Sequence, residues 1–253
     1  MLRSETRDGI EIVYLDHPPV NALDREFLQA IAAHFQDLAE SSPPAVILTA
    51  EGSAFSAGAD LFRVSKESND YIDGSVSALT AAFGSLFEFP RPLIAAVNGH
   101  AIAGGAVITC ACDYRVMAGG KGRIGVAELK VGVPFPTYAL EIIRFGVAPQ
   151  HLQELVYLAE SYAPQDAMQK GFVDEVVHPD ALMDRALEVA ATLAAIPKQS
   201  FEMMKKLLRA PTMDRIARYG GEHDLQAREA WTSDDVQQAI SRFLVATFGI
   251  SPS

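Results

Sequence analysis

Two short segments decide how this sequence is interpreted: Gly99–Ala106, which reads GHAIAGGA, and Phe55–Asp60, which reads FSAGAD. Each follows a run of residues typical of a β-strand, and each consists almost entirely of small side chains. Such side chains carry little chemistry, but they let a ligand atom approach the backbone closely. Backbone N–H groups at a helix start are unpaired donors at the positive end of the helix dipole. Two converging amides of this kind would form an oxyanion hole, which stabilises an enolate or a tetrahedral oxyanion.

The composition is that of a globular chain: 253 residues, of which 49% are hydrophobic and 21% charged. The formal net charge of −11 argues against a nucleic-acid surface, which needs clustered Lys and Arg. Cys110 and Cys112 are separated by one residue in an apolar run, a spacing that suits neither a disulfide nor a zinc site. The first residues show no signal-peptide pattern, and no stretch is typical of a membrane span. We therefore expect a cytoplasmic protein without a nucleic-acid or membrane partner.

Strand-like and helix-like patterns alternate through the first two-thirds of the chain, which predicts an α/β core. The predicted strands are bounded by Gly, Pro or charged residues and lie within Gly9–Asp16, Pro44–Glu51, Pro92–Gly99 and Asp113–Gly119. Apolar residues at helical spacing predict helices over Ser75–Glu88 and over Leu23–Ser41, with Asp24 as the N-cap of the latter. After about Pro136 helical patterns dominate, among them residues 197–209 and 233–248. We place a boundary near residue 195, between a core of residues 1–195 that holds the site and a helical region of residues 196–253.

Several familiar motifs are missing from the sequence. AFSAG lacks the leading Gly of the G-x-S-x-G nucleophile elbow, so Ser56 has little support as a nucleophile. GHAIAGGA has the glycine spacing of a phosphate loop, but Gly105 and Ala106 stand where that loop needs Lys and Ser or Thr. No G-x-G-x-x-G follows the first strand, and the six histidines form no H-E-x-x-H pattern. We therefore expect neither a dinucleotide fold nor a metal site.

Five stretches together resemble the crotonase superfamily, also called the enoyl-CoA hydratase/isomerase family. In chain order they are AFSAGADL, RPLIAAVNGHAIAGGA, CDYRVMA, GVAELKVGVPFP and APQDAMQKGFVDEVV. The resemblance covers essentially the whole chain and implies a spiral of ββα turns with a helical C-terminal region. It implies assembly into homotrimers or dimers of trimers. It also implies an acyl-CoA thioester as substrate, with no metal or redox cofactor.

The resemblance also assigns roles to residues of the two small-residue segments. The amides of Ala59 and Gly104 occupy the positions of the family's two donors to the thioester oxygen. Ala57, Asp60 and Leu61 are expected beside the substrate. The resemblance thus explains why both segments carry only small side chains: two backbone amides can hold one oxygen there.

The carboxylates distinguish reactions within this family. Hydratases that resemble this sequence carry one Glu shortly after the glycine loop and a second in a following segment, and use both to add water. Here the first position is Val107, which we expect in the dry wall of the substrate pocket, and the second is Glu128. A single carboxylate suits a proton shuttle from carbon 2 to carbon 4 of a 3-enoyl-CoA. We expect burial beside the acyl chain to raise the pKa of Glu128.

These features predict a Δ3,Δ2-enoyl-CoA isomerase of fatty-acid β-oxidation. Two alternatives stay open: a hydratase or other acyl-CoA lyase that uses a different acid, and an acyl-CoA-binding protein without turnover. Asp60 and Asp113 are expected to brace or cap loops, and the segment Val64–Asp73 to line or cover the pocket. The cations that could meet the phosphates of coenzyme A, although a solvated face explains each equally well, are Arg63, Lys66, Lys205, Lys206 and Arg209.

Overall fold

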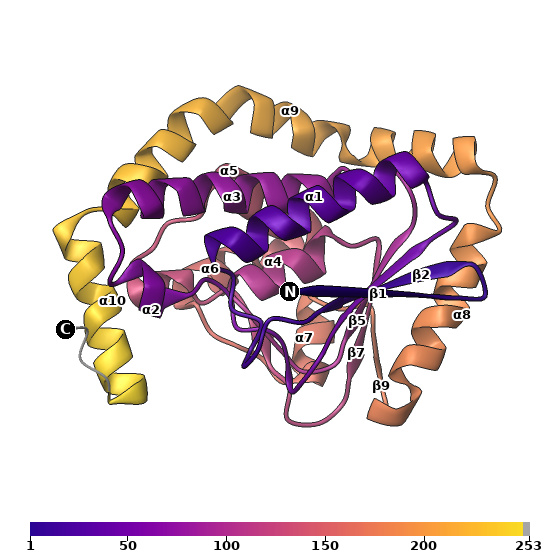
Figure 1. The fold of residues 1–253 in the computed structure, drawn as a ribbon, viewed down its shortest axis with the longest axis horizontal. Helices are drawn as coiled ribbons and strands as arrows, with labels where there is room; N and C mark the ends of the chain where they lie inside the picture. The colour runs from indigo at the N-terminus through magenta and orange to yellow at the C-terminus, as the bar shows by residue number, and fades with distance from the viewer. Residues whose placement is uncertain (250–253) are drawn as a thin grey trace.

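The main sheet of the protein has six strands in the order β1-β2-β3-β5-β7-β9, in a computed structural model that describes residues 1–249 (Figure 1). β1 and β2 are antiparallel, and each later pair of neighbours is parallel. All residues of β3 and β5 are buried, as expected for parallel strands covered on both faces. The strands are β1 (Leu2–Arg7), β2 (Ile10–Leu15), β3 (Val46–Ala50), β5 (Leu93–Val97), β7 (Tyr114–Ala118) and β9 (Glu175–Val177).

A second, smaller parallel sheet contains β4 (Ala54–Ser56), β6 (His100–Ile102) and β8 (Ile124–Gly125). Along the chain, β3, β5 and β7 are each followed by one of these short strands and then by helix. The helical elements are α2 (Leu61–Val64) and α3 (Asn69–Phe87), then α4 (Gly104–Ala111), then the 3₁₀ turn η1 (Glu128–Val131) and α5 (Thr137–Gly146). The predicted spiral of ββα turns is confirmed.

The side chains of the main sheet alternate between two apolar layers. Ile12, Ile47 and Ile94 pack in one layer with residues of α8 (Leu182–Ala194). Their neighbours in the chain, such as Val13 and Leu48, pack in the other layer, where α1 (Arg25–Ser41), α3, α4 and α5 supply the apolar partners. This alternation follows from the two-residue period of a strand. The two small-residue loops therefore rest on a sheet whose two faces are both covered.

The first helices begin at capping side chains. Asp24 accepts a hydrogen bond from Phe27 N–H at 2.7 Å, which confirms it as the N-cap of α1. α3 begins at Asn69, earlier than the predicted Ser75, because the Ser68 hydroxyl accepts from the Tyr71 amide at 3.3 Å. Much of the segment expected to line the pocket is therefore the end of α2 and the first turn of α3.

The C-terminal part contains a helix longer than predicted. After α6 (Leu152–Leu158) and α7 (Pro164–Lys170), α9 (Lys198–Trp231) runs for 34 residues over α3 and α5, and α10 (Asp234–Phe248) turns back beside α2 (Figure 1). Pro211 lies inside α9 without ending it, although proline removes a backbone donor. The boundary near residue 195 falls in the turn before α9, and the division into two domains stays a prediction.

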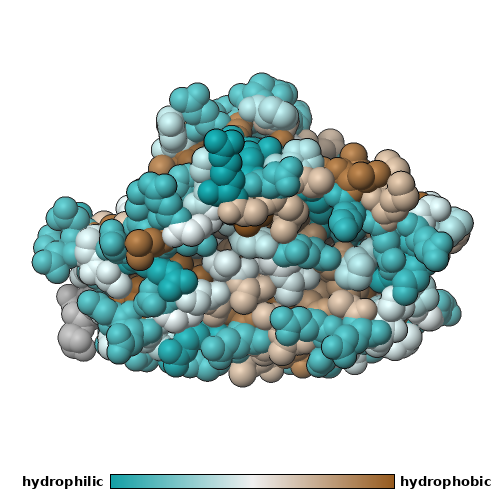
Figure 2. All heavy atoms as spheres, turned by 90° about the horizontal axis from the view of Figure 1, so that it is seen from above, coloured by the Kyte–Doolittle hydropathy of each residue, from teal (hydrophilic) through white to brown (hydrophobic). Residues whose placement is uncertain are grey.

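The face that α9 crosses carries apolar patches between polar side chains (Figure 2). In the first half of α9, four neighbouring apolar side chains are more than half exposed: Met203 (62%), Met204 (53%), Leu207 (55%) and Leu208 (64%). Their spacing of one and four residues places them along one side of the helix. Contiguous exposed apolar surface of this kind is typical of a contact with another macromolecule.

Candidate active site

The two small-residue loops lie in direct backbone contact. Gly58 has a φ of +81°, and a Cβ atom there would lie 2.7 Å from the Ile102 carbonyl oxygen and 2.8 Å from the Ala103 Cβ. A Cβ atom on Gly105 would lie 2.5 Å from the carbonyl oxygen of Ser56. Because these spaces hold no side-chain carbon, glycine alone permits the two loops to approach this closely.

The amides of Ala59 and Gly104 are free donors at this junction. Leu23 N–H donates to Gly58 O at 2.8 Å, and Asp60 N–H donates to Leu23 O at 3.3 Å, which holds the chain on both sides of Ala59. Gly104 is the first residue of α4, where a helical amide has no partner within its helix. Within residues 1–249, neither amide donates to a protein acceptor. A Cβ atom on Gly58 would lie 3.3 Å from the Gly104 nitrogen, so the structure brings the two predicted donors together.

Glu128 reaches the same place from the next turn of the spiral. β8 pairs with β6, and Ala103 N–H donates to Gly125 O at 2.8 Å, which sets the start of η1 beside the glycine loop. The Oε2 atom of Glu128 is inaccessible to solvent and has no hydrogen-bond partner in the described part of the chain. Burial raises the pKa of Glu128 to about 8, in the direction predicted from the sequence. A buried carboxylate oxygen without a partner is rare, and such groups gather at functional sites.

Ala59, Ala103, Glu128 and Trp231 all line two adjoining apolar cavities, of about 100 Å³ and about 30 Å³. Glu128 is the only titratable side chain that lines either cavity in the described residues. The larger cavity is completed mainly by Ala57, Leu61, Ile102, Val131, Val133 and Phe243. The smaller one is completed by Leu79, Phe83, Gly104, Phe135, Pro136 and Ala139.

Of the remaining predicted site residues, two line the larger cavity and two line neither cavity. Ala57 and Leu61 line the larger cavity. Asp60 is absent from both cavity walls, and its carboxylate caps α2 by accepting from Arg63 N–H at 3.1 Å, as a capping role predicts. Val107 is completely buried in α4 and is likewise absent from both walls. Valine at this position therefore belongs to the apolar core behind the glycine loop.

Trp231 and Phe243 are site residues that the sequence analysis missed. They come from the end of α9 and from α10, far along the chain from the two loops. The sequence holds one tryptophan, but no local motif connects it to residues near 59 or 128. The length of α9 carries Trp231 to the cavity, and the return of α10 towards α2 and η1 brings Phe243 there.

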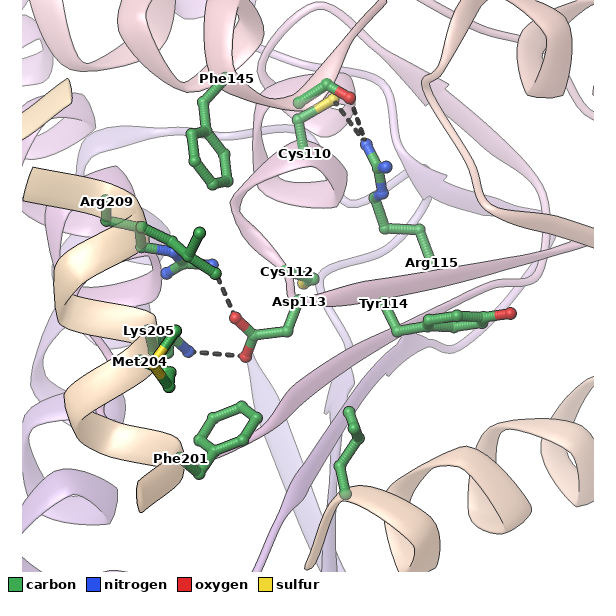
Figure 3. A pocket seen from close by; sticks show the side chains of 13 residues that line it. Cys110, Cys112, Asp113, Tyr114, Arg115, Phe145, Phe201, Met204, Lys205 and Arg209 are labelled. Carbon is green, nitrogen blue, oxygen red and sulfur yellow. Dashed lines mark hydrogen bonds and ion pairs between the residues drawn. The ribbon is translucent and has the colours of Figure 1, made fainter. Parts of the chain in front are cut away.

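A separate cavity of about 310 Å³ surrounds a buried ion network at the first half of α9 (Figure 3). The Asp113 carboxylate accepts from Lys205 Nζ at 2.6 Å, from Arg209 at 2.8 Å and from Leu93 N–H at 2.8 Å. The prediction that Asp113 braces a loop is confirmed. Lys205 and Arg209 are buried by these contacts, so the prediction that they could meet coenzyme A phosphates is wrong.

Arg63 is also committed to carboxylates of its own chain. Its guanidinium lies 2.6 Å from Glu26, 3.4 Å from Asp24 and 3.3 Å from Glu67. These contacts tie α2 to the start of α1. Among the five candidate cations, only Lys66 and Lys206 are exposed.

No group of three or more His, Cys, Asp or Glu residues within residues 1–249 is arranged to hold a metal ion. No described helix is both long and apolar enough to cross a membrane.

Comparisons with known proteins agree with the resemblance seen in the sequence. A family model described as enoyl-CoA hydratase/isomerase matches residues 5–245. The mitochondrial enoyl-CoA delta isomerase 1 of Homo sapiens is 28% identical over 240 residues, which are 93% of this chain and 79% of that protein. A putative enoyl-CoA hydratase of Thermus thermophilus is 31% identical over 206 residues, which are 79% of this chain and 81% of that protein.

Solved structures show the same architecture. The crystal structure of human mitochondrial delta3-delta2-enoyl-CoA isomerase superposes with a TM-score of 0.92 at 26% identity, covering 97% of each chain. An enoyl-CoA hydratase from Bacillus halodurans superposes with a TM-score of 0.85 at 18% identity, over 95% of this chain and 99% of that one. The second likeness shows the fold alone.

Proposed function

Because the chain belongs to the enoyl-CoA hydratase/isomerase family, we propose that it is an enoyl-CoA isomerase that moves a double bond from carbon 3 to carbon 2 of an acyl-CoA thioester. Relatives named as isomerases and as hydratases both match the chain at similar identity. The choice between the two reactions therefore rests on the side chains of the site.

One observation carries this proposal: Glu128 is the only titratable side chain in the walls of the two cavities, among the described residues. Adding water by the family's two-carboxylate route needs a second acid or base beside the double bond. The position that would supply it holds Val107, which is buried in the core. Moving a proton within one substrate needs a single group that first accepts the proton and then returns it.

The proposed reaction uses three groups of this chain. The Glu128 carboxylate takes a proton from carbon 2 of a 3-enoyl-CoA, and the electron pair delocalises through the carbonyl and the double bond to give a dienolate. The amides of Ala59 and Gly104 donate hydrogen bonds to the thioester oxygen, where the negative charge develops. Glu128 then returns the proton to carbon 4, which leaves the double bond between carbons 2 and 3. The step consumes no water and needs no separate cofactor.

A raised pKa suits this use of Glu128. A carboxylate whose pKa is about 8 is a stronger base than an exposed one, and its acid form still loses a proton readily near neutral pH. The apolar walls exclude water, which keeps the proton on the substrate or on Glu128.

The test is a turnover assay of the wild type and Glu128→Gln with a trans-3-enoyl-CoA and, separately, with a trans-2-enoyl-CoA, identifying every product. We expect isomerisation without hydration, and a loss of about 10²–10⁴-fold in kcat for the variant. Rapid formation of 3-hydroxyacyl-CoA by the wild type would instead favour a hydratase. Binding without conversion of either substrate would favour an acyl-CoA-binding protein.

We also propose that copies of the chain associate through the exposed apolar side of α9, into a homotrimer or a dimer of trimers. The four exposed side chains Met203, Met204, Leu207 and Leu208 support this proposal, since a second copy would remove them from water. A cytoplasmic location stays a prediction; the human relative is named as mitochondrial.

A further inference from the structure

Trp231 occupies the wall between the two cavities. It is 3% exposed and lines both of them. The other shared wall residues are Glu128 and the small residues Ala59 and Ala103, so the indole supplies most of the bulk there. No other element of the described chain contributes a large apolar side chain to both spaces.

We propose that Trp231 sets the length of the acyl chain that the site accepts. This inference rests on the proposed function, which places the thioester oxygen at the Ala59 and Gly104 amides and carbons 2 to 4 beside Glu128. The cavity next to Gly104 measures about 30 Å³, room for about two water-sized groups. A longer acyl chain must enter either the space that the indole fills or the larger cavity on the other side of the indole. Trp231 therefore limits the unaltered site to short chains.

The indole is fixed in place by polar contacts. Its Nε1 donates to Pro134 O at 3.0 Å, in the segment just before the wall residues Phe135 and Pro136. The Gln237 side chain donates to the Trp231 carbonyl oxygen at 2.7 Å. The first bond fixes the ring and the second fixes its main chain, because moving either one breaks a partly buried hydrogen bond.

Two further contacts hold the end of α9 against the core. Asp224 accepts from Thr137 N–H, at the start of α5, at 2.7 Å. Arg228 lies 3.2 Å from Asp73 on α3. α9 is thus tied to both helices that carry the smaller cavity, so a change in the Trp231 side chain alters the wall without releasing the helix.

The volume of the whole site supports the same limit. Ligand sites that enclose drug-sized molecules measure roughly 300–1,000 Å³. The two cavities, of about 100 Å³ and about 30 Å³, are far smaller. Both are lined almost entirely by apolar side chains, so volume rather than polarity restricts the acyl chain.

The experiment measures the dissociation constants of saturated acyl-CoA thioesters, from butanoyl- to dodecanoyl-CoA, by isothermal titration calorimetry. The proteins are the wild type, Trp231→Ala, Trp231→Leu and Trp231→Phe, each checked for folding by circular dichroism. We expect the wild-type affinity to level off at a short chain. For Trp231→Ala and Trp231→Leu we expect it to keep rising by about fourfold for each further methylene that is buried. Trp231→Phe keeps a ring but not the N–H donor, and should level off close to the wild type.

Ile216→Ala is the matched control, since Ile216 is a buried residue of the same helix that lines neither cavity. It should keep the wild-type dependence on chain length. The proposal is overturned if the wild-type affinity rises steadily to dodecanoyl-CoA, or if the two small-residue variants level off where the wild type does. It is also overturned if Ile216→Ala shifts the dependence as Trp231→Ala does.

Saturated thioesters bind without reacting, so this result does not depend on the isomerase activity. A protein that binds short chains selectively but converts no 3-enoyl-CoA would support the role of Trp231 and contradict the proposed reaction. Turnover of 3-enoyl-CoA with no chain-length effect of Trp231 would support the proposed reaction and contradict the role of Trp231.

Discussion

Two carboxylates of this protein, Asp113 and Glu128, are withdrawn from solvent but differ in their partners. Asp113 accepts hydrogen bonds from Lys205, Arg209 and the Leu93 amide, and joins α9 to the sheet. The Glu128 Oε2 atom accepts none from the described chain and faces an apolar cavity. A buried charge that is paired on every side is typical of a structural role, whereas a carboxylate with an unpaired buried oxygen has a raised pKa and is typical of proton-transfer sites. The lack of a partner on Oε2, rather than burial alone, is therefore what distinguishes Glu128 as the proposed proton carrier.

The largest expected effects come from neutralising each carboxylate in turn. Glu128→Gln should lower kcat by about 10²–10⁴-fold and leave the free energy of unfolding at neutral pH unchanged or raised. Asp113→Asn should lower the free energy of unfolding by about 3–5 kcal/mol, because two buried cations lose their counter-charge. Turnover assays measure the change in kcat, and urea unfolding measures the change in the free energy of unfolding, on both variants. A Glu128→Gln variant as unstable as Asp113→Asn would show that Glu128 is structural.

The close contact between the two loops at Gly58 leads to a second prediction. Gly58→Ala should lower kcat by about 10²-fold, because its Cβ would push the Ile102 backbone and displace the Gly104 amide. Gly52→Ala is its control: Gly52 has a similar φ of +82°, but a Cβ there meets nothing within 4 Å. It should lose only about 1 kcal/mol of stability from its strained backbone and keep its activity. Equal kinetic losses in the two variants would contradict a role for close loop contact.

A third prediction concerns pH. If the Glu128 carboxylate is the base, kcat/KM should fall by about tenfold for each pH unit below a pKa of about 8. Folding raises this pKa from 4.5, so between those two values the folded state holds a proton that the unfolded state has released. The free energy of unfolding should therefore decrease as pH rises through that window.

Glu128→Gln is the control for the stability part of this prediction, since it should abolish that contribution. pH-dependent turnover and urea unfolding, each in buffers of matched ionic strength, give both profiles. A kcat/KM that stays flat from pH 6 to 8 would mean that another group takes the proton.

The smallest kinetic effect is expected beside the Asp113 network, on the exposed side of α9. Leu208→Glu should shift the assembly towards monomers in light scattering, because a second copy would have to bury the new charge. Leu225→Glu, an equally exposed position later on the same helix, is the control. The activity of a monomer should stay within about threefold of the wild type, since Trp231 and Phe243 reach the cavity from the same chain. Unchanged assembly by Leu208→Glu would contradict the proposed contact.

The sequence predicted the parts of the fold that depend on neighbouring residues. The strands around Ile47, Ile94 and Val116 and the cap at Asp24 follow from local patterns and were confirmed. The convergence of Ala59, Gly104 and Glu128 was predicted through the family resemblance. Their spacing alone could not establish it, because it depends on parallel pairing of β4, β6 and β8.

Other features could not be predicted because they depend on distant parts of the chain. Lys205 and Arg209 look like a solvated basic face until α9 is seen to lie against Asp113. The continuation of α9 through Pro211 is likewise decided by packing on α3 and α5, which outweighs the unfavourable propensity of proline. Trp231 enters the site only because this helix is long enough to carry it there.

The origin of the cavity walls has a consequence for how such proteins can diverge. The atoms proposed to hold the oxygen and move the proton belong to loops of the ββα spiral, whereas Trp231 and Phe243 belong to α9 and α10. Mutations in the last two helices can therefore remodel the space for the acyl chain and leave the reacting centre intact. If the proposed roles hold, new substrate ranges become accessible to a lineage through changes in the C-terminal helices alone.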